Sequence, residues 1–123
     1  MPVRSSASSV LKWPNNQAVD RAVRAWAKLV ADSHPEVVRI GYFGSYARGD
    51  WGVGSDLDLV VIVGEAAEPF SRRPLALNTL ELPVPTDLLV YTTAEWRRLL
   101  EEPRPFAQRM DREAVWVVRE PSG

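Results

Sequence analysis

The 123-residue sequence predicts one α/β or α+β domain with a mixed β-sheet of about four strands, flanked by helices. Two observations lead to this prediction. Some segments repeat apolar residues at helical spacing, others are short, apolar and β-branched, and the two kinds alternate along the chain. The chain length also suits a single domain of ordinary size. We expect an N-terminal tail over residues 1–14 and one domain over residues 15–123.

The first part of that domain predicts a helix followed by a strand. Apolar residues recur every three or four positions over residues 15–32, which is typical of an amphipathic helix. Asn15 or Asn16 can cap its start, and His34-Pro35 ends it. Residues 37–43 are rich in β-branched and aromatic side chains and have no helical period, so they predict a strand.

A turn and a second strand follow. Gly44-Ser45 interrupts the first strand, and residues 45–48 can form one or two helical turns. Three glycines, at positions 49, 52 and 54, then predict a loop. Residues 56–63 predict the second strand. Its uninterrupted apolar end, residues 59–63, indicates burial on both faces and therefore a central place in the sheet.

The connection after this strand is the least regular part of the sequence. Residues 65–85 carry four prolines, and we expect only a short helix within residues 72–80. A lid, a partner contact and an ordinary connection all remain open for this segment. Residues 87–91 then predict a third strand.

The C-terminal part predicts two helices and a last strand. Thr92 and Glu95 have the spacing of a capping box, which opens a helix that ends before Pro103. A short helix over residues 105–110 and a strand over residues 114–118 complete the fold. Helices and strands therefore alternate to the end of the chain.

The composition excludes several classes of protein. There is no cysteine and only one histidine, His34, so disulfides, thiol nucleophiles, zinc–thiolate sites and multi-histidine sites are excluded. A hydrophobic content of 46% and a charged content of 25% exclude disorder of the whole chain. The chain has 15 basic and 16 acidic residues, so it lacks the basic excess that is typical of a nucleic-acid-binding domain. We expect no direct nucleic-acid binding.

The sequence predicts neither a membrane span nor a secretion signal. Its longest apolar run, residues 59–63, is far shorter than the roughly 20 residues that a membrane-spanning helix needs. Residues 1–14 are rich in serine and lack the apolar stretch of a secretory signal. We therefore expect a cytoplasmic protein with no membrane partner.

Three features that could carry chemistry lie close together in this scheme. The first is Gly44-Ser45, at a strand-to-helix turn. Glycine lets the backbone approach a ligand closely, the first amides of the next helix can bind an anion, and the serine hydroxyl adds a donor. Taken alone, such a turn is more often a plain turn with a helix cap.

The other two features are acidic. Asp56 and Asp58 alternate with leucines, so both carboxylates share one face of the predicted strand. They repel each other unless water or a cation neutralises them, and paired aspartates commonly hold magnesium beside a substrate phosphate. An acidic strand boundary is the alternative. Asp87 opens the third strand, and its carboxylate joins the pair if that strand lies beside residues 56–63. It could equally be a turn residue.

In this order, the features resemble the signature of the DNA polymerase beta-like nucleotidyltransferase superfamily. That signature is a hydrophobic residue with Gly-Ser or Gly-Gly, about ten variable residues, Asp-hydrophobic-Asp/Glu-hydrophobic, and a carboxylate on a later strand. Residues 43–45, the ten residues after them, residues 56–59 and Asp87 match it. The resemblance covers about residues 37–91. The Ala-Arg-Gly stretch after Gly-Ser, and Ser55, are similar to the minimal nucleotidyltransferase (MNT) branch.

The resemblance implies a role for each matching residue. Gly44 and Ser45 would hold the triphosphate of ATP. Asp56 and Asp58 would bind magnesium, and Asp87 would bind a second magnesium ion or act as the base toward an acceptor hydroxyl. Two such ions stabilise the attacking and leaving oxygens of an in-line displacement.

Two further residues are open to more than one interpretation. Arg48 could contribute to nucleotide binding by offsetting phosphate or carboxylate charge, and it could equally be a surface or structural arginine. The five tryptophans are mostly core or amphipathic-face residues, but Trp51, in the glycine loop, is an exception that could stack on a base or be an exposed partner contact.

The resemblance implies a magnesium-dependent enzyme that transfers AMP from ATP to an acceptor hydroxyl. Larger members use extra domains to hold the acceptor, so we expect the acceptor here on another protein. Small MNT proteins are similar to antitoxins paired with a HEPN-domain toxin, usually encoded by the adjacent gene, which implies adenylylation of a toxin tyrosine. Two alternatives stay open: a module that acts by docking with a weak or silent site, and a nucleotidyltransferase for a small molecule such as an aminoglycoside.

Overall fold

The computed structural model describes residues 13–102 and 105–119. Their strands form one mixed sheet in the order β3-β2-β1-β4. β1 (Val37–Phe43) pairs antiparallel with β2 (Leu57–Val63) and with β4 (Val115–Val118), and β2 pairs parallel with β3 (Thr86–Thr92). The predicted mixed sheet of four strands and the central place of β2 are confirmed.

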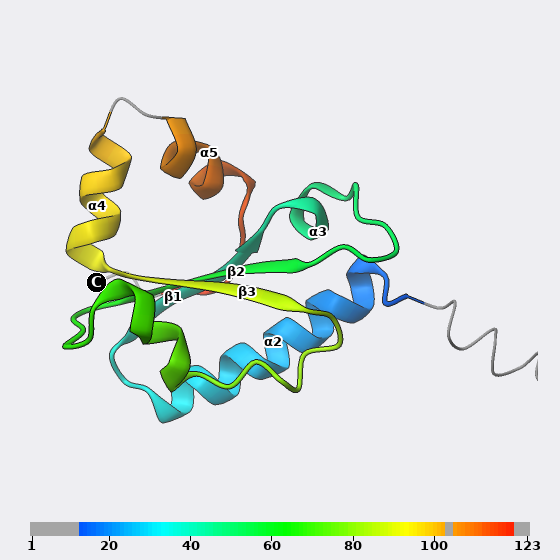
Figure 1. Cartoon of the computed structure of the whole chain (residues 1–123), viewed down its shortest axis with the longest axis horizontal. Helices are drawn as coiled ribbons and strands as arrows, with labels where there is room; N and C mark the ends of the chain where they lie inside the picture. The colour runs from blue at the N-terminus through cyan, green and yellow to red at the C-terminus, as the bar shows by residue number, and fades with distance from the viewer. Residues whose placement is uncertain (1–12, 103–104, 120–123) are drawn as a thin grey trace, which may run out of the picture.

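Helices cover both faces of this sheet (Figure 1). The long helix α2 lies along one face, whereas α4 and α5 lie over the other. A one-turn helix, α3, follows β1, and a 3-10 helix, η1, lies between β2 and β3. Their bounds are α2 (Asn16–Ser33), α3 (Ser45–Arg48), η1 (Phe70–Ala76), α4 (Thr93–Glu101) and α5 (Pro105–Glu113).

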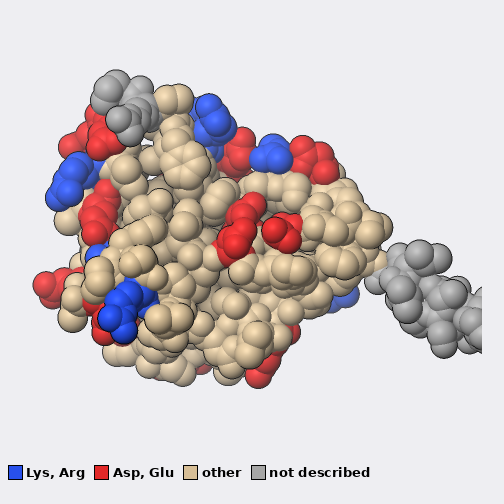
Figure 2. Space-filling view, viewed as in Figure 1, with Lys and Arg blue, Asp and Glu red and all other residues tan. Residues whose placement is uncertain are grey.

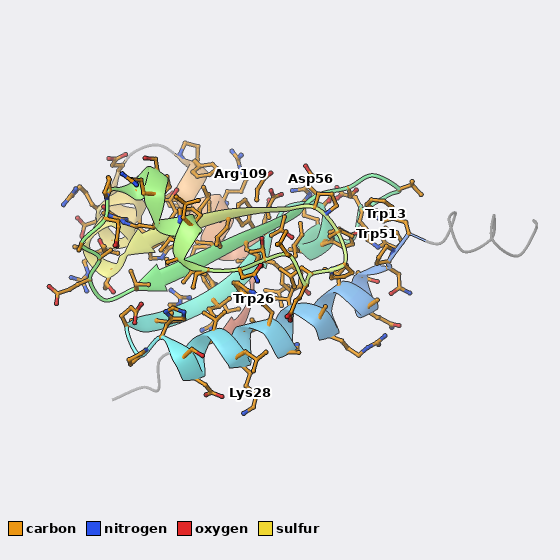
Figure 3. All side chains as sticks on the ribbon, turned by 60° about the horizontal axis from the view of Figure 1, so that its bottom comes forward. Trp13, Trp26, Lys28, Trp51, Asp56 and Arg109 are labelled. Atoms are coloured by element: carbon orange, nitrogen blue, oxygen red, sulfur yellow. The ribbon has the colours of Figure 1, made fainter. Side chains whose placement is uncertain are left out.

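Helix α2 forms as its sequence pattern predicts. Asn15 caps it, since its side chain accepts a hydrogen bond of 2.9 Å from the amide of Ala18. The helix buries one stripe of side chains against the sheet, and Figure 3 shows Trp26 pointing into the molecule and Lys28 away from it. This stripe consists of Val19, Val23, Trp26, Ala27 and Val30. Each such side chain contributes about 1.5–3 kcal/mol on full burial, apart from the smaller alanine.

Strand β2 is buried on both faces because helices lie on both sides of it. Leu57, Leu59, Val61 and Val63 pack in the cluster that contains α2, whereas Val60 and Ile62 pack with α4 and α5. Asp58 alternates with the first set, so it belongs to the face that α5 covers. Because of this alternation, the carboxylate of Asp58 lies on the face covered by α5 and not on the face covered by α2.

The connection between β2 and β3 packs against the fold. Its helix, η1, begins at Phe70 and is of the 3-10 type, so the expected helix within residues 72–80 is only partly right in position. Pro74 lies inside η1 and has no amide to donate, which disfavours a regular α-helix there. The indole of Trp26 donates a hydrogen bond of 2.7 Å to the carbonyl of Asn78, and Leu82 is buried.

The C-terminal elements differ from the prediction only at their ends. Thr92 and Glu95 form the predicted capping box at the start of α4. Helix α5 continues to Glu113, three residues beyond its predicted end, because Met110 is buried against the sheet and fixes another turn. Strands β2 and β4 each begin one residue later than predicted, so Asp56 precedes its strand.

The first described residues contact the turn after β1. The indole of Trp13 donates a hydrogen bond of 2.9 Å to the hydroxyl of Tyr46, which in turn donates to the carbonyl of Pro14 at 3.1 Å. Residues 1–12, most of the predicted tail, lie outside the described residues. No helix within residues 13–102 and 105–119 has the length and apolar character to cross a membrane.

Candidate active site

The turn between β1 and α3 can be made only by glycine. Gly44 has φ 78° and ψ −152°, a region that side-chain-bearing residues essentially never occupy. A Cβ at this position would also collide with Oδ2 of Asp58. The carbonyl of Gly44 accepts hydrogen bonds from the amides of Ala47 and Arg48, at 3.0 and 2.9 Å, and these bonds close α3. Ser45 is the first residue of that helix.

The three predicted aspartates lie at the same end of the sheet. Asp58 is half-buried on β2, and Asp87 is its direct neighbour across the parallel ladder with β3. Neighbouring residues in such a ladder point to the same face. Asp56 is exposed in the loop before β2. The condition under which Asp87 was expected to join the pair, that β3 lies beside β2, is therefore met.

The charges of these carboxylates act on Asp58. Partial burial raises the pKa of Asp58 above its ordinary value, and the negative charges of Asp87 and Asp56 raise it further, while Arg48 opposes the shift. The ionised form of Asp58 is therefore disfavoured in the folded protein. A bound cation would relieve this penalty, because an opposite charge stabilises the ionised carboxylate.

A cleft of about 410 Å³ opens over this end of the sheet. Five of the six predicted site residues line it, and Asp87 does not, although it adjoins Asp58. In Figure 2, acidic side chains gather where β2 and β3 begin, and basic and acidic side chains alternate above them on the side of α3 and α5. The lining residues are Phe43, Gly44, Ser45, Arg48, Asp56, Asp58, Phe106, Arg109, Met110 and Glu113.

Arg48 is held by carboxylates of the protein itself. Its Nε lies 3.1 Å from Oδ2 of Asp50, and its Nη1 lies 3.4 Å from Oε1 of Glu113. Arg48 therefore ties the glycine loop to α5 across one end of the cleft. These contacts agree with the interpretation of Arg48 as a structural arginine. Its contribution to nucleotide binding remains a prediction.

Sequence reasoning missed the wall that α5 contributes. Phe106, Arg109, Met110 and Glu113 stand at spacings of three and four, so they form one face of the helix. Their only signal in the sequence was this amphipathic spacing, which does not reveal what the helix faces. Trp51 does not line the cleft. It stacks on Tyr46, with the rings 5.7 Å apart and 7° from parallel, and packs against the core, although its place in the sequence set it apart from the core tryptophans; its expected stacking on a base or contact with a partner stays a prediction.

The cleft suits magnesium that arrives with a nucleotide. In the described part of the chain, no three histidine, aspartate or glutamate side chains converge closely enough to hold a metal by themselves. Magnesium commonly takes only one or two protein carboxylates and completes its shell with water and substrate phosphates. Asp56 and Asp58 fit that requirement, because their carboxylate oxygens line one cleft. The negative charge of Asp58 is also disfavoured there, and a cation would stabilise it.

A second cavity, of about 250 Å³, lies at the other end of the sheet. Its buried cation is Arg73, whose side chain is 9% exposed. The Arg73 guanidinium makes two bonds to Glu95, of 2.6 and 3.1 Å, and one to the carbonyl of Val90. Because this charge is already paired, the cavity offers no comparable group to a ligand.

The fold and the cleft together define a domain of the nucleotidyltransferase class. A sequence model of the nucleotidyltransferase domain matches residues 23–111, which include all six predicted site residues. The chain belongs to this nucleotidyltransferase domain family.

Among solved structures that are similar to this chain, one supports the fold. A candidate nucleotidyltransferase from Sulfolobus solfataricus superimposes with a TM-score of 0.56 and 24% identity, covering 68% of this chain and 75% of that one. A toxin–antitoxin structure with AMP-PNP has a TM-score of 0.49 and 19% sequence identity, and the match covers 78% of this chain and 73% of that one. A mutant of the toxin–antitoxin MntA-HpeT has a TM-score of 0.46 and 17% sequence identity, and the match covers 76% of this chain and 69% of that one. No curated protein matches the chain significantly in sequence.

Proposed function

We propose that this chain is a magnesium-dependent nucleotidyltransferase that moves AMP from ATP to a hydroxyl of a partner protein. Membership of the nucleotidyltransferase domain family supports nucleotidyl transfer. One observation carries the proposal further. The carboxylate of Asp58 lies against the Gly44 turn, so a turn suited to phosphate and carboxylates suited to magnesium share one cleft.

Five of the six predicted residues have a role in this reaction. Gly44 and Ser45 hold the triphosphate, and Asp56 and Asp58 would hold the magnesium. Bound magnesium supplies positive charge that stabilises the developing charge on the attacking and leaving oxygens. The acceptor oxygen forms a bond to the α-phosphorus, and the bond from that phosphorus to the bridging oxygen breaks. Pyrophosphate leaves, and Asp87 takes the proton of the acceptor hydroxyl. Alternatively Asp87 would hold a second magnesium ion, and the proton then passes to solvent water.

The proposed acceptor is a tyrosine of a HEPN-domain toxin, encoded by the adjacent gene and met in the cytoplasm. The support is the similarity of Ala47-Arg48-Gly49 and Ser55 to the MNT branch. In this proposal the chain is an antitoxin, and AMP on the toxin tyrosine disables the toxin.

The test is the intact mass of the co-expressed partner after incubation with this chain, ATP and magnesium. We expect a gain of whole AMP units that disappears without magnesium and with the Asp56→Asn/Asp58→Asn double variant. Asp32→Asn, an exposed aspartate on α2, is the matched control and should transfer AMP like the wild type. A stable complex with no mass change would instead favour docking, and AMP transfer to an aminoglycoside without any partner would favour the small-molecule alternative.

A further inference from the structure

The wall of the cleft opposite the motif residues is one face of α5. Ala107 and Met110 are each 2% exposed, so the helix is anchored in the core independently of any ligand. From that anchored helix, Phe106 and Arg109 both line the cleft and are exposed. Figure 3 shows Arg109 and Asp56 along the same side of the molecule.

The charges around the cleft single out Arg109. A nucleoside triphosphate brings several negative charges into a cleft that already contains Asp56 and Asp58, so binding needs protein cations as well as magnesium. Arg48 already has two carboxylate partners, Asp50 and Glu113. Within residues 13–102 and 105–119, Arg109 forms no ion pair. It is therefore the lining arginine whose guanidinium can bind phosphate without leaving another carboxylate.

The order of residues along α5 suggests how the nucleotide lies. Glu113 is bonded to Arg48, so the C-terminal end of α5 is next to α3 and the Gly44 turn. Arg109 lies about one turn further out, and Phe106 about one turn beyond that. A triphosphate that begins at Ser45 would thus pass Arg109 and bring its nucleoside to Phe106. Phe106 is 51% exposed, which makes it an apolar platform for a base.

We propose that α5 is the nucleotide-binding wall of this cleft, with Arg109 contacting the phosphates and Phe106 packing against the base of a nucleoside triphosphate. This inference rests on the proposed function, because it assigns the ligand of the same site. In this proposal Arg109, which lies outside the sequence motif, makes part of the phosphate contact that was expected of Arg48.

The experiment is calorimetric titration of the purified chain with ATP and with AMP, both in magnesium. We expect Arg109→Gln to weaken ATP binding about ten- to a hundred-fold, as for a lost charged hydrogen bond, and AMP binding much less. Phe106→Leu should weaken both nucleotides by a similar factor of about three to ten. Arg112→Gln is the matched control, since Arg112 is an exposed arginine of the same helix that does not line the cleft.

The outcomes separate this inference from the proposed function. If the wild type binds ATP and Arg109→Gln binds it as tightly as Arg112→Gln does, α5 is not the phosphate wall, and the proposed function stands. Loss of transfer to the partner with unchanged ATP affinity would also overturn the inference, since Arg109 would then contact the acceptor. If the wild type binds no nucleoside triphosphate with magnesium, both proposals fail. Circular dichroism of each variant shows whether it is folded.

Discussion

The carboxylate of Asp58 occupies the space that a side chain at Gly44 would need. The two residues are 14 positions apart in the sequence and meet because β1 and β2 are antiparallel neighbours, with Phe43 opposite Asp58. The ten-residue spacer of the motif is the α3 turn and glycine loop that let the chain reverse between these strands. The spacing of the motif therefore allows the Gly44 turn and the carboxylate of Asp58 to meet.

The first prediction concerns Gly44→Ala. The substitution forces a side chain into a backbone region that only glycine adopts and pushes it into Asp58. We expect a loss of at least about 2 kcal/mol in the free energy of unfolding, measured by urea denaturation, because such backbone strain alone costs about 1–3 kcal/mol. ATP affinity should fall as well, because Asp58 must move.

Two other glycines separate the causes of that loss. Gly49 has φ 90° but open space around it, so Gly49→Ala measures backbone strain alone and should cost about 1 kcal/mol. Gly52 has open space and no positive φ, so Gly52→Ala should change little. Equal losses for Gly44→Ala and Gly49→Ala would show that contact with Asp58 does not constrain the turn.

The second prediction is that Asp58→Asn removes transfer but does not weaken the fold. The pKa of Asp58 is raised in the folded protein, so its ionised form costs stability above that pKa, and the cost disappears as acid protonates the group. We expect the metal-free variant to have a Tm at pH 7 equal to or above that of the wild type. The difference should vanish below the ordinary aspartate pKa of about 3.9.

Thermal unfolding in EDTA, and then in magnesium with ATP, checks this prediction. Ligand should raise the Tm of the wild type by several degrees and leave that of Asp58→Asn nearly unchanged, because ligand binding stabilises only a protein that binds it. Asp56→Asn is a useful comparison, since Asp56 is exposed and its removal should weaken binding without lowering the metal-free Tm. A clearly lower Tm for metal-free Asp58→Asn would show that the carboxylate has a structural role instead.

The third prediction concerns the ion pair behind the other cavity. Bonds from Arg73, and next from the amide of Thr92, lower the pKa of Glu95 to about 2. A depressed carboxylate pKa stabilises the fold above the ordinary glutamate value, and this contribution is lost as pH falls through about 2. Glu95→Gln should therefore lower the free energy of unfolding by about 1–3 kcal/mol at neutral pH, since it leaves the buried guanidinium of Arg73 less well paired.

Urea denaturation at pH values stepped from about 7 down to about 2.5 measures this effect. The difference in the free energy of unfolding between the wild type and Glu95→Gln should become smaller as the pH falls through the acid range. Glu36→Gln, which removes an exposed partner of His34, should have an effect within about 0.5 kcal/mol. A gap that is independent of pH would mean that the charge of Glu95 does not stabilise the fold.

Much of the fold was predictable because it depends on contacts within a few residues. The cap at Asn15, the capping box of Thr92 and Glu95, and the alternation along β2 each follow from local hydrogen bonding or from side-chain period. The helix near residues 70–76 was partly misplaced because its position depends on packing against α2 and the sheet, and because Pro74 favours a 3-10 turn.

The sequence by itself determined the motif: a Gly-Ser turn after the first strand, and Asp56 and Asp58 alternating with leucines where a central strand begins. Only the tertiary structure decided that β3 pairs with β2 and so sets Asp87 beside Asp58, and that α5 brings Phe106 and Arg109 to the same cleft. The physical reason is the range of the interactions involved. Turn geometry and side-chain alternation act between near neighbours in the chain, whereas strand pairing and helix packing join segments dozens of residues apart, and their outcome depends on the packing of the whole core.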